Sequence, residues 1–415
     1  MRSSRTLWTI CLGLLVLAWT ALQAGCQPAK APPKGGDQQP AAEPGEEPGE
    51  EPGEEPGEEP GEEPGEEPGE EPGKEPGEEP AGEPTEEPGE EPAEGAATME
   101  IEVPLGLPEL PVPDDNPMTA EKVELGKLLY FDTRVSKDGT ISCATCHDPQ
   151  MAWAEHRPTS AGIKDAEGHP QVGGRNSPTV INAAYATSQF WDGREPSLEA
   201  QAVGPVGNPI EMGSSMDDVV ADFSKIDGYQ ERFQAVFGTG VTEEGFAKAV
   251  AAFERTVLSG NSPYDQFKAG DEAALDESQK RGMALFEEHC DMCHRAPLFS
   301  NYNFYNAGVG MDAEEPDKGR MEVTGEERDL GKFRVPALRE VANTAPYYHD
   351  GSVEKLEDAV ALMADGGMDN PDLSSAFKGL AAEEFTEQDL ADLVAFLNAL
   401  SGDYPKTEPP TEFPQ

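Results

Sequence analysis

The pattern of hydrophobic and polar positions beyond residue 98 is helical, and alternating, strand-like stretches are almost absent. The clearest case is segment 242–260, in which Thr242 can cap the start of a helix and Gly260 can end it. The hydrophobic face of this segment consists of Phe246, Val250, Phe253 and Val257. The pattern therefore predicts an amphipathic helix whose one face is packed on a core.

A second helix of this kind is expected in segment 385–402, near the end of the chain. Thr386 and Asp389 have the spacing of a capping box, and Gly402 is placed to end the helix. Shorter amphipathic runs predict helices near residues 119–130, 216–225 and 278–292. The sequence thus indicates a mainly α-helical protein.

Long loops rich in Gly, Pro and Asn separate these helices, for example at residues 155–180 and 300–347. Loops of this length in a compact domain are usually functional. We expect them to wrap a large cofactor, which would supply the core that the helices alone do not.

The first residues of the chain have the three-part plan of a secretory signal. Residues 1–26 begin with two arginines, continue with an apolar run from Leu7 to Leu22 and end on small residues before Cys26. The sequence "LQAGC" also resembles a bacterial lipobox, with Gln23 where Leu is usual, so lipidation of Cys26 with membrane attachment and plain cleavage nearby are both open. The apolar run is short for a bilayer span. We expect an exported, periplasmic protein.

Residues 27–98 repeat Pro-Gly-Glu-Glu with a period of four. Because proline removes backbone donors, glycine adds chain entropy and the glutamates repel one another, this segment is expected to be a disordered tether. Its 25 acidic and 3 basic residues give a net charge of −22, which leaves −32 on residues 99–415. This charge argues against nucleic-acid binding and suits a basic soluble partner, although an acidic surface for solubility explains it equally well.

Four of the six cysteines form two copies of the motif Cys-x-x-Cys-His. These are Cys143, Cys146 and His147, and Cys290, Cys293 and His294. Two thiols at this spacing can form thioethers with the two vinyl groups of haem, and the histidine that follows can bind the iron. Zinc, a redox dithiol and two disulfides are the alternatives, but a zinc or dithiol site does not require the trailing histidine in both copies. The motifs therefore predict two covalently bound haem c groups.

Two motifs 147 residues apart predict two haem domains, at residues 99–265 and 266–402, followed by a tail at 403–415. The sixth position of each iron decides between electron transfer and catalysis. The remaining histidines are His156, His169, His289 and His349. Composition alone does not choose among them.

Several specific segments, in the same order, resemble the bacterial di-haem cytochrome c peroxidase family. They include "LGKLLYFDTRVSKDGTISCATCHDP", "GGRNSPTVINAAY", "QFWDGREPSLEAQAVGPVGNPIEMG" and "GKFRVPALREVANTAPYYHDGS". The resemblance runs from Leu125 to Gly402 and leaves the signal and the tether outside. It implies two cytochrome c-like domains, an N-terminal haem that reduces hydrogen peroxide and a C-terminal haem that accepts electrons. A monohaem cytochrome c or a blue copper protein would be the electron donor.

The resemblance also assigns roles to residues of the N-terminal domain. Glu211 matches the catalytic acid/base, Gln201 the distal amide, and Trp191 the tryptophan between the two haems. A half-buried carboxylate can take a proton from one peroxide oxygen and deliver it to the other. His169 resembles the histidine that occupies the peroxidatic iron of the oxidised resting enzyme, so reduction of the second haem would be needed to expel it. Without the resemblance, Trp191 would be a core indole and His169 a surface residue.

Met363 has two interpretations. By helical period, Leu356, Val360 and Met363 share one face, which favours core packing. In the resemblance, Met363 stands fourteen residues after His349, where the family's peroxidases have the methionine ligand of the C-terminal iron. Thioether ligation raises the reduction potential and suits an electron-receiving haem. Relatives that oxidise tryptophan residues of another protein carry Tyr there, so Met363 favours a peroxidase.

Asn176, Thr344 and Pro346 match positions at which the family binds calcium between the domains, mostly through carbonyl oxygens, which suit this ion. Two other functions are open. One is an enzyme that oxidises tryptophan residues of a partner protein, and the other is a non-catalytic di-haem electron carrier. Gln201 and Glu211 argue against the carrier. The identity of the donor and the formation of a homodimer are not decided by the sequence.

Overall fold

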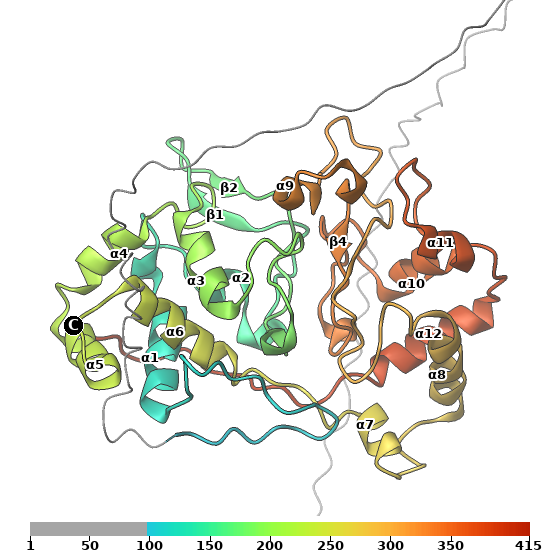
Figure 1. Ribbon diagram of the computed structural model, residues 1–415, viewed down its shortest axis with the longest axis horizontal. Helices are drawn as coiled ribbons and strands as arrows, with labels where there is room; N and C mark the ends of the chain where they lie inside the picture. Colours follow the sequence, from blue (N-terminus) through green and yellow to red (C-terminus); the bar gives the residue numbers. More distant parts are fainter. Residues whose placement is uncertain (1–97) are drawn as a thin grey trace, which may run out of the picture. The chain divides into compact units, whose positions relative to one another are not determined.

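The computed structural model of the protein describes residues 98–415. The expected signal, the lipidation of Cys26 and nearly all of the tether lie outside these residues. The described part is mainly α-helical, as predicted, and Figure 1 shows its helices in two groups. The first group comprises α1 (Ala120–Phe131), α2 (Cys143–Cys146), α3 (Leu198–Gly207), α4 (Met216–Phe223), α5 (Asp227–Phe237) and α6 (Glu243–Glu254). The later helices are α7 (Pro263–Lys268), α8 (Glu277–His289), α9 (Met321–Thr324), α10 (Leu356–Ala364), α11 (Ser375–Leu380) and α12 (Glu387–Asn398).

The predicted helix starts are confirmed, and the predicted ends are wrong. Thr242 accepts a hydrogen bond from the backbone N–H of Gly245, and Thr386 forms the expected capping box with Asp389. However, α6 ends at Glu254 and α12 ends at Asn398, several residues before the glycines that were expected to end them. The chain continues from both helices in turns. Gly260 then pairs with Asp403 in an isolated antiparallel bridge, so these glycines lie where two segments cross.

The two halves share one packing plan. In the first half α1 crosses α6, and in the second half α8 crosses α12. Each crossing is made at a glycine. A Cβ on Gly126 would overlap the carbonyl oxygen of Ala249, and a Cβ on Gly282 would overlap that of Asp392. The glycines therefore let each helix pair approach backbone to backbone.

Replacing Gly126 with Ala is expected to lower the free energy of unfolding by about 1–3 kcal/mol, because the added methyl group overpacks the crossing of α1 and α6. Denaturant titration of the haem-loaded protein measures the effect. The matched control is Gly207→Ala, at the end of α3, where an added Cβ meets no atom within 4 Å. Equal stability of the two variants would show that the close approach at Gly126 has no energetic importance.

The long loops contain the strands, which the periodicity did not predict. The first loop forms an antiparallel pair of β1 (Ala161–Lys164) and β2 (Pro170–Val172). The second forms a pair of β3 (Phe304–Tyr305) and β4 (Phe333–Arg334). These strands are only two to four residues long, so a two-residue alternation has no room to appear in the sequence.

The expected tail, residues 403–415, is a structured segment that returns to the first half of the molecule. Its Pro405 carbonyl accepts a hydrogen bond from the Trp153 indole at 2.7 Å, and its last residue, Gln415, accepts one from the backbone of Gly228 at 3.1 Å. Figure 1 accordingly places the C-terminus beside α5. Tyr404 and Phe413 pack against the core of the first half, so this segment contributes to that core.

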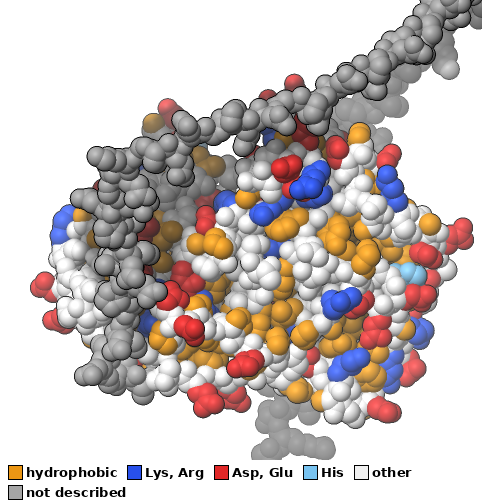
Figure 2. Space-filling model, in the orientation of Figure 1, with side chains coloured by type: hydrophobic (Ala, Val, Ile, Leu, Met, Phe, Trp, Pro, Cys, Tyr) orange, Lys and Arg blue, Asp and Glu red, His pale blue; other side chains and the backbone are white. Residues whose placement is uncertain are grey.

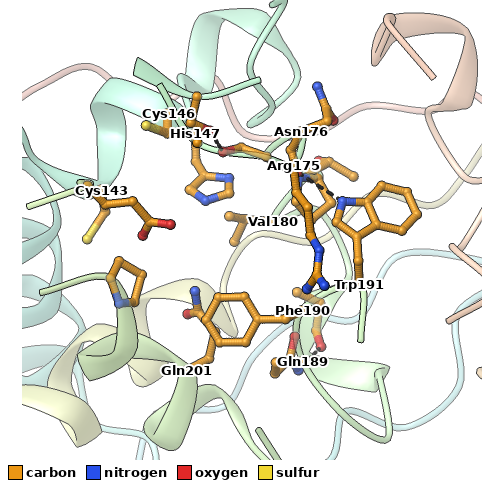
Figure 3. Close-up of a pocket in the computed structure, with 18 of the residues that line it drawn as sticks. Cys143, Cys146, His147, Arg175, Asn176, Val180, Gln189, Phe190, Trp191 and Gln201 are labelled. Carbon is orange, nitrogen blue, oxygen red and sulfur yellow. Dashed lines mark hydrogen bonds between the residues drawn. The ribbon is translucent and has the colours of Figure 1, made fainter. Parts of the chain in front are cut away.

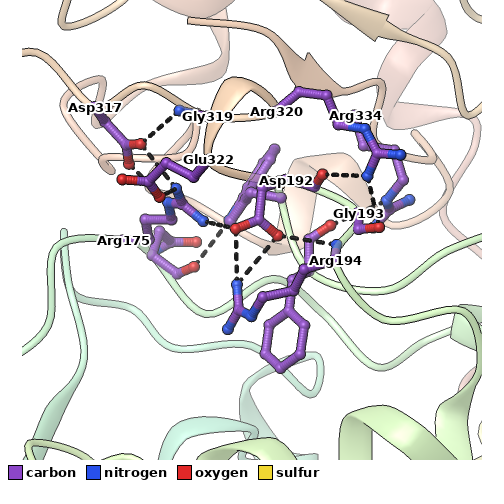
Figure 4. A network of polar contacts seen from close by, with 12 residues as sticks. Arg175, Asp192, Gly193, Arg194, Asp317, Gly319, Arg320, Glu322 and Arg334 are labelled. Atoms are coloured by element: carbon purple, nitrogen blue, oxygen red, sulfur yellow. Dashed lines mark hydrogen bonds and ion pairs between the residues drawn. The ribbon is translucent and has the colours of Figure 1, made fainter. Parts of the chain in front are cut away.

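Ion pairs connect the two halves (Figure 4). Arg175 of the first half binds Asp192 of the same half and also Asp317 and Glu322 of the second, at 2.7 and 3.2 Å. Arg320 of the second half donates to the backbone carbonyls of Asp192 and Gly193 at 2.9 and 2.8 Å. The loop that follows Trp191 is therefore held from both sides.

On the face seen in Figure 2, acidic side chains lie mostly around the margin, and hydrophobic side chains gather toward the middle. Within residues 98–415, no helix has the length and the apolar character that a membrane span requires.

Candidate active site

A cavity of about 480 Å³ lies beside the first Cys-x-x-Cys-His motif. Its wall includes seven of the residues that the sequence singled out, namely Cys143, Cys146, His147, Asn176, Trp191, Gln201 and Glu211. Figure 3 shows the two cysteines on one side of the cavity and Trp191 on the other. The second half of the chain also contributes to the wall, through Tyr302, Asp317, Glu322, Arg334, Pro336 and Ala337. Side chains far apart in sequence thus meet at one cavity of a volume usual for cofactor sites.

The His147 ring points into this cavity (Figure 3), and its Nδ1 is buried without a hydrogen-bond partner among the described residues. Burial lowers the pKa of His147, and the nearby backbone of Pro178 and Trp153 only partly opposes this. A lowered pKa favours the neutral imidazole, the form that binds metals. Tyr130 fixes the backbone at this point by donating its hydroxyl proton to the His147 carbonyl at 3.0 Å. An unpartnered histidine facing an open cavity fits an axial ligand of haem iron.

The four motif cysteines form no disulfide. Burial raises the pKa of Cys146 to about 12, and it raises that of Cys143 further. A redox-active dithiol requires the opposite shift, since its attacking sulfur must be a thiolate. The site thus fits thioether attachment of haem better than it fits dithiol chemistry.

Gln201 and Glu211 reach the cavity from α3 and from the turn that follows it. Ser197 caps α3 and places Gln201 in its second turn. The backbone of Glu211 is fixed twice, since its N–H donates to the Asn208 carbonyl at 3.1 Å and its carbonyl accepts from Ile163 of β1 at 2.8 Å. Burial raises the pKa of the Glu211 carboxyl, although Arg194 and Asn208 oppose the shift. This carboxyl exchanges a proton at higher pH than an exposed glutamate does.

Trp191 occupies the part of the cavity wall that faces the second half. Its indole N–H donates to the Asn176 carbonyl at 2.9 Å, and its own carbonyl accepts from the N–H of Arg334 in β4 at 2.8 Å. Trp153, by contrast, is fully buried and is the core indole of the first half. Of the two tryptophans beyond the tether, only Trp191 faces the cavity.

At the second motif, the Nδ1 of His294 donates to the Phe299 carbonyl at 3.0 Å. In a neutral imidazole this leaves Nε2 as the atom with a free lone pair. Met363 is half-buried in the last turn of α10. Leu356 and Val360 of the same helix pack in the core of the second half, whereas Met363 is not part of that cluster. The helical face that the periodicity predicted is therefore not a continuous core face.

The structure does not bring His169 to the cavity. His169 lies in the turn between β1 and β2, with 78% of its side chain exposed and its Nδ1 3.7 Å from a carboxylate oxygen of Asp165. His349, in contrast, is buried and stacks on the Phe333 ring with centroids 3.6 Å apart. The carbonyl of His349 accepts from the N–H of Asn176 at 2.7 Å, so this histidine lies at the contact between the halves.

Of the three expected calcium ligands, only Asn176 lines the cavity. Its side-chain amide donates to the Arg157 carbonyl at 2.8 Å. Thr344 and Pro346 lie in the segment that leads to His349, which contacts Asn176 through its backbone. Among the described residues, no cluster of three His, Cys, Asp or Glu side chains forms a metal site. The ligands expected here are mostly carbonyl oxygens.

Several residues of the cavity wall were not predicted from the sequence. Glu254 has an unpartnered Oε2, and burial raises its pKa to about 8. A signal for it was present, because Glu254 follows Val250 by four residues and so falls on the apolar face of α6. Arg334 and Tyr302 had no such signal, since they come from the second half of the chain.

Comparisons with known proteins agree with this geometry. The family model for di-haem cytochrome c peroxidase matches residues 120–273, and that for cytochrome c matches residues 279–401. The chain is 40% identical over 304 residues to cytochrome c peroxidase Ccp of Escherichia coli, covering 72% of this chain and 62% of that relative. The chain thus spans less than two thirds of that protein.

Two further similar proteins are matched over most of their own length. Methylamine utilization protein MauG of Methylorubrum extorquens is 37% identical over 299 residues, which cover 71% of this chain and 82% of that protein. A solved structure, described as a MauG-like protein associated with microbial copper homeostasis, has a TM-score of 0.66 at 31% identity and covers 74% and 96% of the two chains. Together with the two motifs and the cavity, these matches show that the chain belongs to the di-haem cytochrome c peroxidase family.

Proposed function

We propose that the protein reduces hydrogen peroxide to two molecules of water, using two electrons from a small redox protein and two protons. The observation that carries this proposal is the meeting of Glu211, Gln201 and His147 at one cavity wall. A non-catalytic electron carrier would have no use for a carboxyl and an amide facing the same space.

The family implies covalently bound haem c, and the thiols of each motif would hold one haem, with His147 and His294 as iron ligands. Bound in the cavity, the haem would supply the iron centre and the electrons for cleavage of the O–O bond. The residues of this chain hold the substrate and move its protons. Gln201 can orient peroxide through its amide group. Glu211 can accept the proton of one peroxide oxygen and return it to the oxygen that leaves as water.

Electrons are proposed to enter at the second haem, which His294 and Met363 would ligate. Trp191 would then relay them toward the cavity, since its indole lines the wall and its backbone is bonded to β4. A monohaem cytochrome c or a blue copper protein is the proposed donor, and the net charge of −32 on residues 99–415 favours a basic one. Export to the periplasm agrees with such donors, and lipidation of Cys26 and a homodimer are also proposed.

A second candidate function is the oxidation of tryptophan residues in a partner protein, and the similarity to MauG is the observation that favours it. Met363 is our reason for ranking it second. Turnover assays decide between the two. We expect rapid peroxide-dependent oxidation of a reduced monohaem cytochrome c, and no conversion of tryptophan residues in a supplied partner protein. Conversion of tryptophan in the partner, without rapid oxidation of the cytochrome, would instead favour the second candidate function.

We propose that His169 binds the cavity iron in the fully oxidised protein. The turn between β1 and β2 would then have to fold inward, because the His169 side chain is exposed in this structure. A His169→Ala variant is expected to react with peroxide without prior reduction. Unchanged dependence on reduction would exclude this role.

We also propose that calcium binds between the halves, at Asn176, Thr344 and Pro346. Removing it with a chelator is expected to lower peroxide turnover, because the Asn176 carbonyl holds the Trp191 indole at 2.9 Å. Added Ca²⁺ should restore turnover and Mg²⁺ should not, since an irregular set of carbonyl ligands suits the larger ion. Purified active protein that contains no calcium by elemental analysis would refute the site.

A further inference from the structure

Arg334 is a cationic side chain of the cavity wall that has no carboxylate partner. Its Nε donates weakly to the Phe190 carbonyl at 3.3 Å, and no Asp or Glu of the described residues lies within ion-pair distance. Burial lowers the pKa of Arg334, and only Tyr302 opposes this shift. The remaining guanidinium donors are therefore unused in a region that disfavours a lone charge.

The positive charges of other arginines in the interior are paired with carboxylates. Arg339 is 2% exposed and binds both carboxylate oxygens of Asp265, at 2.7 and 2.8 Å. Arg255 is 3% exposed and lies 2.7 Å from Glu199. Arg175, in the same cavity wall as Arg334, has three carboxylates. Arg334 is half-buried in the cavity wall, and because charges in such places are normally paired, the lack of a carboxylate at Arg334 indicates that an anion is missing there.

Tyr302 is a second, independent sign of a missing acceptor. Its side chain is 8% exposed and lines the same cavity, and its hydroxyl oxygen is buried without a hydrogen-bond partner. The Arg334 guanidinium lies over its ring, 5.5 Å from the centroid. Two unused donors thus stand side by side in the part of the wall that the second half of the chain provides.

We propose that Arg334 and Tyr302 bind a propionate of the haem that is attached to Cys143 and Cys146. The vinyl groups that form the thioethers and the two propionates lie on different edges of the haem. Figure 3 shows the cysteines on one side of the cavity and Trp191 on the other, so a haem attached to these cysteines would direct its propionate edge toward Trp191. Arg334 is on that side, since its N–H is bonded to the Trp191 carbonyl. This inference rests on haem in the cavity but not on the reduction of peroxide.

The binding would join the first haem to the second half of the molecule. The segment from Arg334 to Pro336 contacts Trp191 through the backbone of Arg334, and its Pro336 backbone lies beside the His294 ring. The same three residues therefore border both haem sites. An arginine that neutralises a propionate also raises the reduction potential of that haem, because it disfavours the additional positive charge of the oxidised iron.

The test is a redox titration of each haem in the full-length di-haem protein, without peroxide. In Arg334→Gln we expect the equilibrium constant for reduction of the Cys143/Cys146 haem to fall at least about tenfold, or about 59 mV for one electron, while the other haem is unchanged. Tyr302→Phe should give a smaller shift of the same sign, and Arg334→Lys should retain most of the wild-type potential. The control is Arg320→Gln, because Arg320 is satisfied by two carbonyls and does not line the cavity.

No shift in Arg334→Gln, a shift confined to the second haem, or an equal shift in Arg320→Gln would each overturn the inference. If Arg334→Gln fails to fold, Tyr302→Phe and Arg334→Lys decide, since both keep the volume of the side chain. A protein that shows the expected shift but ignores peroxide would support this propionate site and refute the proposed function.

Discussion

Replacing Glu211 with Gln is expected to lower peroxide turnover by about 10²–10⁴-fold, the usual contribution of a positioned general acid or base. The amide keeps the size of the side chain but cannot take a proton. Because the backbone of Glu211 is held by Asn208 and β1, the substitution should leave the cavity wall in place. Steady-state turnover with a reduced donor measures the effect. The haem spectra and the rate of haem reduction by the donor should match those of the wild type.

The control is Glu195→Gln, because Glu195 is also half-buried and does not line the cavity. It should retain nearly full activity. Full turnover by Glu211→Gln would refute the assigned role.

The pH dependence of wild-type turnover gives a second test of Glu211. Burial raises the pKa of its carboxyl above the ordinary value of 4.5. The carboxyl must be ionised before it can accept a proton, so turnover should fall as the pH drops through this raised pKa. The acid limb should therefore lie above pH 4.5, and it should be absent from the residual activity of Glu211→Gln. An acid limb that persists unchanged in the variant would assign it to another group.

Replacing Met363 with Leu is expected to remove the sulfur ligand of the second haem and to lower its reduction potential strongly. Axial ligands set haem potentials over a range of about 0.8 V, and a methionine in place of a weaker or absent ligand accounts for the high end. The donor could then no longer reduce this haem, so turnover should be lost although the cavity is unaltered. The measurement is a redox titration together with the charge-transfer band of sulfur-ligated haem.

Two other methionines serve as controls. The backbone N–H of Met368 donates to the Ala307 carbonyl at 2.9 Å, and the Met311 sulfur lies against Gly331. Replacing either with Leu should leave the band and the potential nearly unchanged. If Met368→Leu loses the band and Met363→Leu keeps it, the ligand has been assigned to the wrong methionine.

The parts of the fold that depend on local sequence could be predicted. The caps at Thr242 and Thr386 are defined by hydrogen bonds within four residues, so a short segment contains all of the necessary information. The same is true of the two Cys-x-x-Cys-His motifs. The helix ends were predicted wrongly because a glycine can also be required where two segments pack closely, and not only where a helix ends. Gly260 has this second role, since it pairs with Asp403, a residue far away in the sequence.

The wall of the candidate site could be predicted only in part. The resemblance to the family supplied Trp191, Gln201 and Glu211, and the structure brings all three to the cavity of His147. Arg334 and Tyr302 complete that cavity from the other half. Arg334 stands in a segment that resembles the family, but nothing in the sequence connects either residue with the cavity of His147. The contact of residues 403–415 with Trp153 could not be predicted for the same reason, because it depends on how the two halves pack.

We propose that one polypeptide holds two unequal haems, one closed by Met363 and one able to open toward peroxide. The most direct test adds a single electron to the fully oxidised protein, records the spectra of both haems, and then titrates with peroxide. We expect that the electron resides on the sulfur-ligated haem, that the other haem loses its sixth ligand, and that peroxide then reacts at once. Two haems that both stay six-coordinate, or a spectrum without sulfur ligation, would contradict it.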